Sequence, residues 1–369
     1  MERTKLITLL LTRECNLRCS YCYVKSYTGG TMSLKTAQDI ISQVFEKAAG
    51  SFGRVEFAFL GGEPLCAFHR LREICEWTWG REWPLPYVFS ASTNGTLCTD
   101  EIRRWMAEHN RLFFPSLSYD GLICAQDVNR CGSGSQIDLD FFHQYWPDVP
   151  VKMTITEESV RYLFQNIQLL NERGIQVNDT FADGVPPWKE SSLRILDQQL
   201  QMLCDEQLKR PQPHPSDLLS IDLTKILSDG KRSLFACDAG RTRITYDWDG
   251  KEYGCHLLSP LVLSSWQMDV LPSALFGERP LQDPCSGCEL DMLCPSCEGN
   301  SYRLNQSCWL REDKTCRLFR HQLYFACEFQ MKRLLRKKER DEKDIYTFVS
   351  IQRILRTKPM REIRQYCTA

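Results

Sequence analysis

Nineteen cysteines constrain this chain of 369 residues more than any other feature of its sequence. Three of them, Cys15, Cys19 and Cys22, lie within eight residues near the start, and eight lie between Cys237 and Cys316. A small secreted protein uses cysteines for disulfides, but this chain is large and its first residues lack the cleavage site of a signal peptide. Grouped cysteines in a reducing compartment more often bind metal. We therefore predict a cytoplasmic protein with metal centres at both groups.

The overall composition excludes several classes of partner. The formal net charge is −1, so the sequence does not predict a nucleic-acid partner or attraction to a membrane surface. No apolar run is long enough to cross a bilayer. A hydrophobic content of 43% is typical of a water-soluble protein with a sizeable core.

The first half of the chain alternates between strand and helix patterns. Short apolar runs predict strands at residues 6–12, 55–60, 87–92, 112–118, 151–155 and 175–181. Apolar stripes of helical period predict helices at residues 34–48, 68–79, 100–108, 141–146 and 160–173, with Ser33 as the N-cap of the first. Such alternation predicts an α/β fold with a parallel sheet and right-handed crossovers. The predicted strands end in Cys, Gly and Asn residues, as on the functional face of a βα barrel.

The pattern changes after Asp183. We expect helices at residues 192–208 and 216–228, followed by a Cys-rich segment whose fold depends on metal. The last part, residues 318–365, has helical periodicity. We therefore predict three domains: a barrel over residues 1–225, a Cys-rich domain over 226–318 and a helical extension over 319–369.

The first cysteine group has the chemistry of an iron–sulfur site. Three thiolates on one short loop can hold three irons of a four-iron cluster and leave the fourth iron open. An open iron can chelate an amino acid through its amine and carboxylate. Potentials of such clusters reach about −700 mV, which is low enough for demanding one-electron reductions. The spacing alone is equally compatible with a zinc knuckle or with three unrelated cysteines.

Further motifs follow this group in a fixed order. They are Tyr21 inside the cysteine group, Gly61-Gly62-Glu63-Pro64, Ser92-Thr93-Asn94-Gly95 and Ser118-Tyr119-Asp120-Gly121, followed by Arg130. Each is weak alone, since Gly-Gly-Glu-Pro is usually a turn and Asn-Gly is a common hairpin signal. Together, and in this order, they resemble the radical S-adenosylmethionine (SAM) superfamily over residues 5 to about 185.

This resemblance implies a partial (β/α)6 TIM-type barrel that binds SAM and a [4Fe-4S] cluster. It implies that Cys15, Cys19 and Cys22 bind the cluster and that Gly61, Gly62, Glu63 and Pro64 form the segment that binds the methionine amino group. It also implies that Tyr21, Ser92, Asn94 and Asp120 belong to the SAM site, that Ser118 contacts the ribose and that Arg130 contacts the methionine carboxylate.

The second cysteine group resembles the SPASM extension of radical enzymes that modify peptides, which typically carries two auxiliary four-iron clusters. The resemblance assigns Cys285, Cys288, Cys294 and Cys316 to an outer cluster, and Cys237, Cys255 and Cys297 to an inner one. The chain departs from the family pattern in having two residues, rather than three, before Cys297, and in lacking an extra cysteine before Cys237. The inner cluster would then have three protein ligands and one open iron, or it would take Cys308 as its fourth ligand. Two Cys-x2-Cys pairs are also typical of zinc sites.

Two further features have competing interpretations. His256 stands where sulfatase-maturing members carry a catalytic aspartate, so we predict that it acts as a base. The alternative is a histidine that supports the cluster by hydrogen bonding. The substitution also counts against sulfatase maturation. The basic stretch at residues 332–340 is either a grip for an acidic leader peptide or, more commonly, the solvated face of a helix.

The predicted function is a radical SAM enzyme that introduces an oxidative crosslink, such as a thioether, C–C or C–O bond, into a ribosomally made peptide. It would carry three [4Fe-4S] clusters and take electrons from a flavodoxin or ferredoxin. The predicted barrel begins within ten residues of the start, which leaves no room for an amino-terminal recognition domain. This keeps a small molecule or a folded protein open as the substrate, although a separate protein could supply peptide recognition. The alternatives are a dehydrogenase or maturase acting on a small molecule or on a sulfatase, and, in another class, a zinc-binding interaction module.

Overall fold

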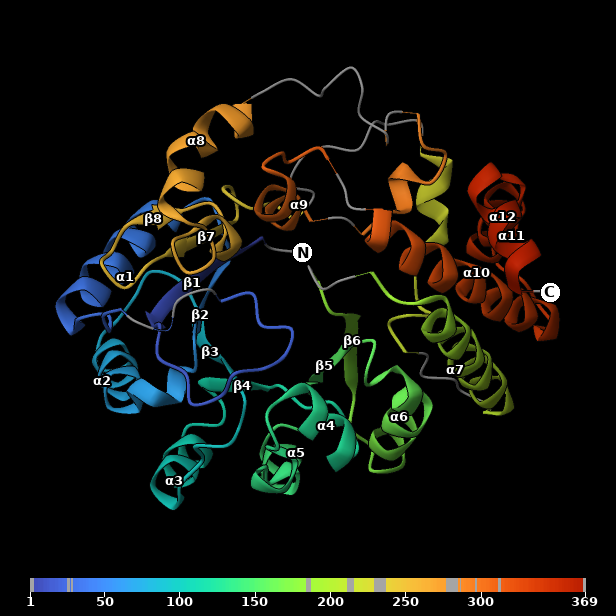
Figure 1. The fold of residues 1–369 in the computed structure, drawn as a ribbon. Coiled ribbons are helices and arrows are strands. Elements are labelled where there is room, and N and C mark those ends of the chain that lie inside the picture. The colour runs from blue at the N-terminus through green and yellow to red at the C-terminus, as the bar shows by residue number, and fades with distance from the viewer. Residues whose placement is uncertain are drawn as a thin grey trace.

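A parallel sheet curved into part of a barrel forms the first half of the molecule (Figure 1). The computed structural model describes residues 3–24, 27, 29–183, 187–210, 216–228, 237–276, 285, 287–295, 297–310 and 313–367. The barrel strands are β1 (Thr4–Thr12), β2 (Arg54–Gly61), β3 (Tyr87–Thr93), β4 (Phe113–Leu117), β5 (Val151–Ile155) and β6 (Val177–Phe181). Neighbouring strands from β1 to β4 pair in parallel, as do β5 and β6, and a bridge between Ser118 and Lys152 continues the curve from β4 to β5.

Helices cover the outside of this curved sheet (Figure 1). They are α1 (Leu34–Ala48), α2 (Phe68–Trp79), α3 (Asp100–Glu108), α4 (Ile123–Asn129), α5 (Leu139–Tyr145) and α6 (Leu163–Glu172). Short 3₁₀ helices lie at Pro64–Ala67, Gly134–Gln136 and Val160–Tyr162. Right-handed crossover helices are how a chain returns to begin the next parallel strand.

The two faces of each barrel strand differ in burial. In β2, Val55, Phe57 and Phe59 are fully buried against the helices, while the residues between them are partly exposed. The same alternation holds in β3 and β4. The helix side of the sheet therefore supplies the main apolar core, and the inner side stays accessible for a site.

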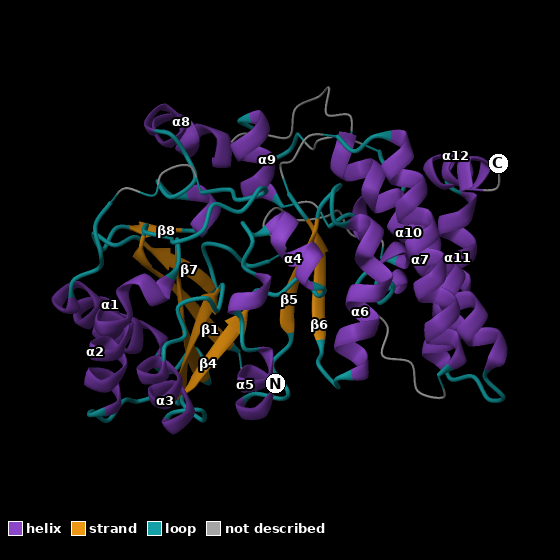
Figure 2. Ribbon diagram, turned by 60° about the horizontal axis from the view of Figure 1, so that its bottom comes forward, coloured by secondary structure: helices purple, strands orange, loops and turns teal. Residues whose placement is uncertain are grey.

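The second half of the chain adds two small strands and a group of helices. The elements are α7 (Glu190–Lys209), the 3₁₀ helix Leu223–Leu227, β7 (Arg243–Tyr246), β8 (Glu252–Tyr253), the 3₁₀ helix His256–Leu258, α8 (Ser265–Phe276), the 3₁₀ helix Asp291–Leu293, α9 (Glu298–Asn305), α10 (Asp313–Arg336), α11 (Glu342–Arg356) and α12 (Lys358–Cys367). Figure 2 shows α7, α10, α11 and α12 gathered on one side of the barrel. No helix in the described ranges is long and apolar enough to cross a bilayer.

The predicted α/β partial barrel is confirmed. The bounds of α1, α2, α3 and β5 agree with the predicted ranges. The helix predicted at residues 216–228 is wrong, because the structure has only the 3₁₀ helix Leu223–Leu227 there. The sequence analysis missed α4, α8, β7 and β8, which are short or, in α8, lack a distinct apolar stripe. β7 pairs in parallel with β1, so the sheet takes a strand from beyond residue 225.

Candidate cluster and cofactor site

The three predicted cluster ligands lie on the loop that leaves β1 at the carboxyl-terminal edge of the sheet. The loop is tightly turned, since the Cys22 N–H donates to the Cys19 carbonyl at 3.1 Å and the Leu17 N–H donates to the Cys15 Sγ at 3.4 Å. Cys15 and Cys19 are half-buried and Cys22 is exposed. We call residues Arg13–Val24 the cluster loop.

The three thiols lie near enough for Cys22 to affect the pKa of both Cys15 and Cys19. Burial raises the pKa of the Cys19 thiol to about 12; Arg130 opposes this change, while Cys22 and Cys15 add to it. Burial likewise raises the pKa of Cys15, with Glu63 and Cys22 acting in the same direction. A cationic metal centre among these sulfurs would reverse the shift and favour the thiolates. The donor set therefore fits an iron–sulfur cluster.

The three thiols are not gathered around one point. Within the part of the chain that the structure describes, no three His, Cys, Asp or Glu side chains form a single-ion site. A four-iron cluster spreads its thiolate ligands over the corners of a cube, so the fit to a cluster does not need such a point.

Two glycines after β2 let the cluster loop approach the sheet. A Cβ on Gly61, which has φ +149°, would stand 2.0 Å from the carbonyl oxygen of Thr12. A Cβ on Gly62 would stand 2.2 Å from the carbonyl oxygen of Glu14. The N–H groups of Gly62 and Glu63 donate to those same two carbonyls, at 2.9 and 2.7 Å. Only glycine permits this close backbone contact.

Glu63 ties the end of β2 to the end of β3. It is 2% exposed, and its carboxylate accepts hydrogen bonds from Leu65 N–H (3.0 Å), Thr93 Oγ1 (2.8 Å) and Asn94 N–H (2.7 Å). Burial raises its pKa to about 7, opposed by these three bonds. The Glu63 side chain is thus engaged in holding the ends of the two strands together.

Asn94 connects the same turn to the cluster loop. Its side-chain amide donates to the side-chain oxygen of Asn16 at 3.0 Å, and Asn16 donates to Thr96 Oγ1 at 2.7 Å. Gly95, at φ +75°, allows the reversal that follows. Sequence analysis missed Asn16, because nothing in its local pattern shows what its side chain faces.

Ser92 and Ser118 are on the inner face of the sheet, and a lysine accompanies them. Lys152 of β5 stands beside Ser118 in the register and donates from Nζ to Ser92 Oγ at 2.8 Å. Burial lowers the pKa of Lys152, and Glu56 opposes this change. Sequence analysis also missed Lys152; its position one residue into a predicted strand was the available signal.

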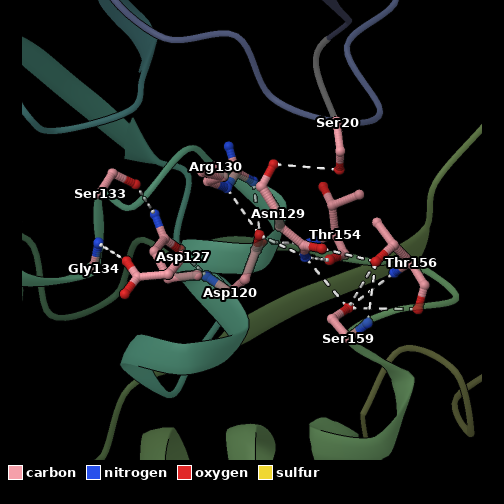
Figure 3. A network of polar contacts seen from close by, with 11 residues as sticks. Ser20, Asp120, Asp127, Asn129, Arg130, Ser133, Gly134, Thr154, Thr156 and Ser159 are labelled. Atoms are coloured by element: carbon pink, nitrogen blue, oxygen red, sulfur yellow. Dashed lines mark hydrogen bonds and ion pairs between the residues drawn. The ribbon is translucent and has the colours of Figure 1, made fainter.

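Asp120 and Arg130 form a buried ion pair (Figure 3). Arg130 Nε and Nη2 donate to the two carboxylate oxygens of Asp120 at 2.9 and 3.0 Å. Burial lowers the pKa of Arg130, but the Asp120 carboxylate opposes this change, and the net result is a pKa above the ordinary value. Two of the Arg130 nitrogen atoms are therefore committed to Asp120. The guanidinium carbon also lies 5.3 Å from the centre of the Tyr21 ring.

The structure places five cysteines of the second group at two different apolar clusters. Cys288 and Cys294 pack against the apolar cluster of α10 and α11, and Cys316 lies in the first turns of α10. Cys255 and Cys297 pack against a second cluster that contains the buried Cys308. Burial raises the pKa of Cys255, with the nearby Cys237 acting in the same direction. Burial also raises that of Cys308 to about 11, with smaller contributions from Glu298 and Cys297.

His256 lies between Cys255 and the cluster loop. Its Nδ1 is 3.9 Å from the Cys255 Sγ, and its ring is 5.6 Å from that of Tyr23 in the cluster loop. Burial lowers its pKa to about 4, and Lys152 acts in the same direction. The imidazole is therefore neutral near pH 7 and can accept a proton only weakly.

Comparison with known proteins follows the same outline. Residues 9–122 match the family model of the Radical SAM superfamily. The cysteine-type anaerobic sulfatase-maturating enzyme of Clostridium perfringens is 28% identical over an alignment of 179 residues that covers 43% of this chain. The match spans about half the length of that relative, 46%.

Two solved structures share the fold. The structure of native anSMEcpe with bound AdoMet and Kp18Cys peptide has a TM-score of 0.67 at 18% identity, covering 90% of this chain and 98% of that one. Streptococcus suis SuiB bound to precursor peptide SuiA has a TM-score of 0.56 at 14% identity, covering 85% of this chain and 76% of that one. At these identities the likeness establishes the fold.

Proposed function

We propose that this chain, whose residues 9–122 form a radical SAM domain, modifies a ribosomally made peptide by radical chemistry. The observation that carries the proposal is the cluster loop pressed against the Gly61-Gly62-Glu63 turn, so that predicted cluster ligands and predicted SAM ligands share one site. When bound and reduced, a cluster there supplies the electron that splits SAM into methionine and a 5′-deoxyadenosyl radical.

The chain's own residues have distinct roles in this proposal. Cys15, Cys19 and Cys22 hold the cluster, and the Gly61–Pro64 backbone receives the methionine amino group. Ser92, Asn94 and Ser118 line the SAM site on the inner face of the sheet. Tyr21, Asp120 and Arg130 complete it, with the remaining Arg130 donors available to the methionine carboxylate. The barrel wall excludes water from a radical that would otherwise be quenched.

The Cys-rich part supplies the oxidising half of the proposal. Cys285, Cys288, Cys294 and Cys316 would hold the outer auxiliary cluster, and Cys237, Cys255 and Cys297 the inner one. Cys255, Cys297 and Cys308 share one neighbourhood. This favours Cys308 as the fourth ligand of the inner cluster over a cluster with one open iron. His256, between this neighbourhood and the barrel, is the proposed base for the proton released when the crosslink forms, and its lowered pKa makes it a weak one.

The peptide substrate is supported by the fold's other members. The anSMEcpe and SuiB structures contain bound peptides, and both chains share this fold. The proposal includes an oxidative crosslink, a flavodoxin or ferredoxin donor, a separate recognition protein and a cytoplasmic location. It also includes the three-domain division at residues 225 and 318, with β7 extending from the second of these domains to pair with β1 of the barrel. Sulfatase maturation is the second candidate, because a sulfatase-maturating enzyme is among the sequence relatives.

Anaerobic SAM cleavage tests the proposal. Reconstituted protein with SAM and dithionite should release 5′-deoxyadenosine, measured by liquid chromatography and mass spectrometry. Replacing Cys15, Cys19 and Cys22 by Ala should lower the rate at least a hundredfold, because no ligand would remain for the cluster. Cys124→Ala, at an exposed cysteine outside both groups, is the matched control.

The same preparation separates the candidate reactions. Iron and sulfide above the content of one cluster would support the auxiliary sites, and stoichiometric zinc in colourless protein would contradict them. Peptides encoded beside the gene should lose two hydrogens on crosslinking. Undiminished 5′-deoxyadenosine release by the triple variant would overturn the assignment.

A further inference from the structure

Asp120 is the centre of a buried polar network at the rim of the barrel (Figure 3). Its carboxylate accepts four hydrogen bonds: from Arg130 Nε and Nη2, from Asn129 Nδ2 at 3.0 Å and from the Thr154 N–H at 2.8 Å. The side chain is 1% exposed. Burying a carboxylate is tolerable only with such complete hydrogen bonding and an opposite charge. The network joins the end of β4, the end of α4 and β5.

The same network reaches the cluster loop through three consecutive residues. The carbonyl of Asn129 accepts a hydrogen bond from the Ser20 N–H at 3.0 Å. Arg130 places its guanidinium over the ring of Tyr21, and the Cys131 Sγ donates to the Arg18 carbonyl at 2.8 Å. Residues 129–131 therefore hold the stretch of loop that carries Cys19.

The backbone of this segment is itself strained. Cys131 has φ +55°, a left-handed conformation that is unfavourable for a non-glycine residue. The turn persists because the contacts on both sides of it fix its ends. One is the bond to Arg18, and another is the bond from the Arg130 N–H to the Gln126 carbonyl at 2.7 Å.

Asn129 anchors the other side of the network. Its amide donates to the Thr154 carbonyl at 2.9 Å, and its oxygen accepts from Thr156 Oγ1 at 2.7 Å (Figure 3). Asn129 is fully buried. The end of α4 is thus fixed to β5, and it can pass that position on to the loop.

We propose that Asp120 is a positioning residue that acts through Arg130 and Asn129 to hold the cluster loop in its cluster-binding conformation. The inference rests on the proposed function for its purpose, since it assumes that this loop holds the cluster. A planar guanidinium gripped at two nitrogens has one orientation, so Asp120 determines where Arg130 meets Tyr21. A lysine at position 130 would keep the charge and lose that orientation.

Two variants separate positioning from general stability. Asp120→Asn leaves Arg130 buried without a counter-charge, so it is expected to destabilise the whole fold. The double variant Asp120→Asn/Arg130→Gln removes both charges and should recover most of the melting temperature. Asp127→Asn is the matched control. Asp127 is on α4, as Asn129 is, and its side chain accepts from the Gly134 N–H at 2.7 Å without contacting the loop.

Hydrogen exchange in metal-free protein gives the first readout. The Ser20 amide should exchange about tenfold faster in the double variant than in the wild type, and Asp127→Asn should match the wild type. After reconstitution, a chelator should also remove iron from the double variant about tenfold faster. A change in the electron paramagnetic resonance spectrum on adding SAM assigns that iron to the cluster held by Cys15, Cys19 and Cys22.

The outcomes distinguish this inference from the proposed function. Wild-type exchange of residues 15–24 in the double variant would overturn the positioning role, whatever the metal content. A weaker SAM affinity with unchanged exchange would also overturn it, by making Arg130 a direct ligand only. If the wild-type protein binds no cluster and the double variant still exchanges faster than the wild type, the positioning of the loop is upheld and the proposed function is contradicted instead.

Discussion

Asp179 shows at the scale of one residue how the fold changes the chemistry of a side chain. It lies on β6, is 4% exposed, and accepts a hydrogen bond from Ser216 Oγ. Burial raises its pKa to about 6, opposed by the bond from Ser216. Folding therefore holds a proton on this carboxyl at a pH where the unfolded chain has released it.

This difference predicts a pH-dependent stability. Between pH 3.8 and about 6 the folded protein binds more protons at Asp179 than the unfolded chain, so its contribution to stability falls as the pH rises. Asp179→Asn removes this loss while leaving an oxygen to accept from Ser216. The free energy of unfolding of the variant relative to wild type should rise by up to about 3 kcal/mol from pH 4 to 8.

Urea unfolding at several pH values measures the difference. Asp148→Asn, at an exposed site, is the control and should keep a constant offset from the wild type. A constant offset for Asp179→Asn as well would contradict the pKa assigned to the buried carboxyl.

At the scale of the element, α11 begins where its capping box places it. The Asp341 side chain accepts from the Asp344 N–H at 2.8 Å, and the Asp344 side chain accepts from the Asp341 N–H at 3.2 Å. Lys337 at the end of α10 donates to both Asp344 oxygens at 2.7 Å. The cap therefore also fixes the corner between the two helices.

Removing the cap should loosen the helix locally. Asp341→Ala should cost about 1 kcal/mol, because one helix N–H loses its acceptor. Amides of residues 342–349 should exchange faster, while amides of α2 and β2 in the barrel stay unchanged. Asp39→Ala, an exposed interior position of α1, is the control and should change stability by less than about 0.5 kcal/mol. Uniformly faster exchange across the molecule would instead mean that α11 unfolds only with the barrel.

At the scale of the whole molecule, the apolar clusters are unequal in size. One large cluster includes buried residues from every strand from β1 to β5 and extends to α7, β7 and α10. The cluster around Cys255, Cys297 and Cys308 is smaller and is built from short segments. Metal ligation in such a region supplies folding free energy that packing does not.

Removal of metal should therefore act unevenly. In chelator-treated protein, residues 255–310, which follow β7 and β8, should become sensitive to protease and exchange rapidly. The barrel segment from 34 to 170 should remain protected, because its core needs no metal. Reconstitution with iron and sulfide should restore resistance, and zinc alone should not. Loss of protection in the barrel at the same chelator concentration would mean that the halves fold as one unit.

The local structure and the order of the functional segments could be predicted from the sequence. Apolar periodicity placed the barrel strands and α1, α2 and α3, because burial on one face repeats with the period of the element. The sequence shows Gly61 and Gly62 but not why glycine is needed there. In the structure, a side chain at either position would collide with the carbonyl oxygen of Thr12 or Glu14. Short α4 and the strands β7 and β8 carried too few residues to show a period.

Which distant side chains meet depends on the tertiary packing. The sequence offered Arg130 as a ligand for a carboxylate, and the fold gives two of its nitrogens to Asp120 and its face to Tyr21. It also brings β7 beside β1 and Lys152 to Ser92. Local pattern fixes the face on which a side chain lies. The partner on that face depends on how strands and helices far apart in the chain pack, and no local pattern contains that information.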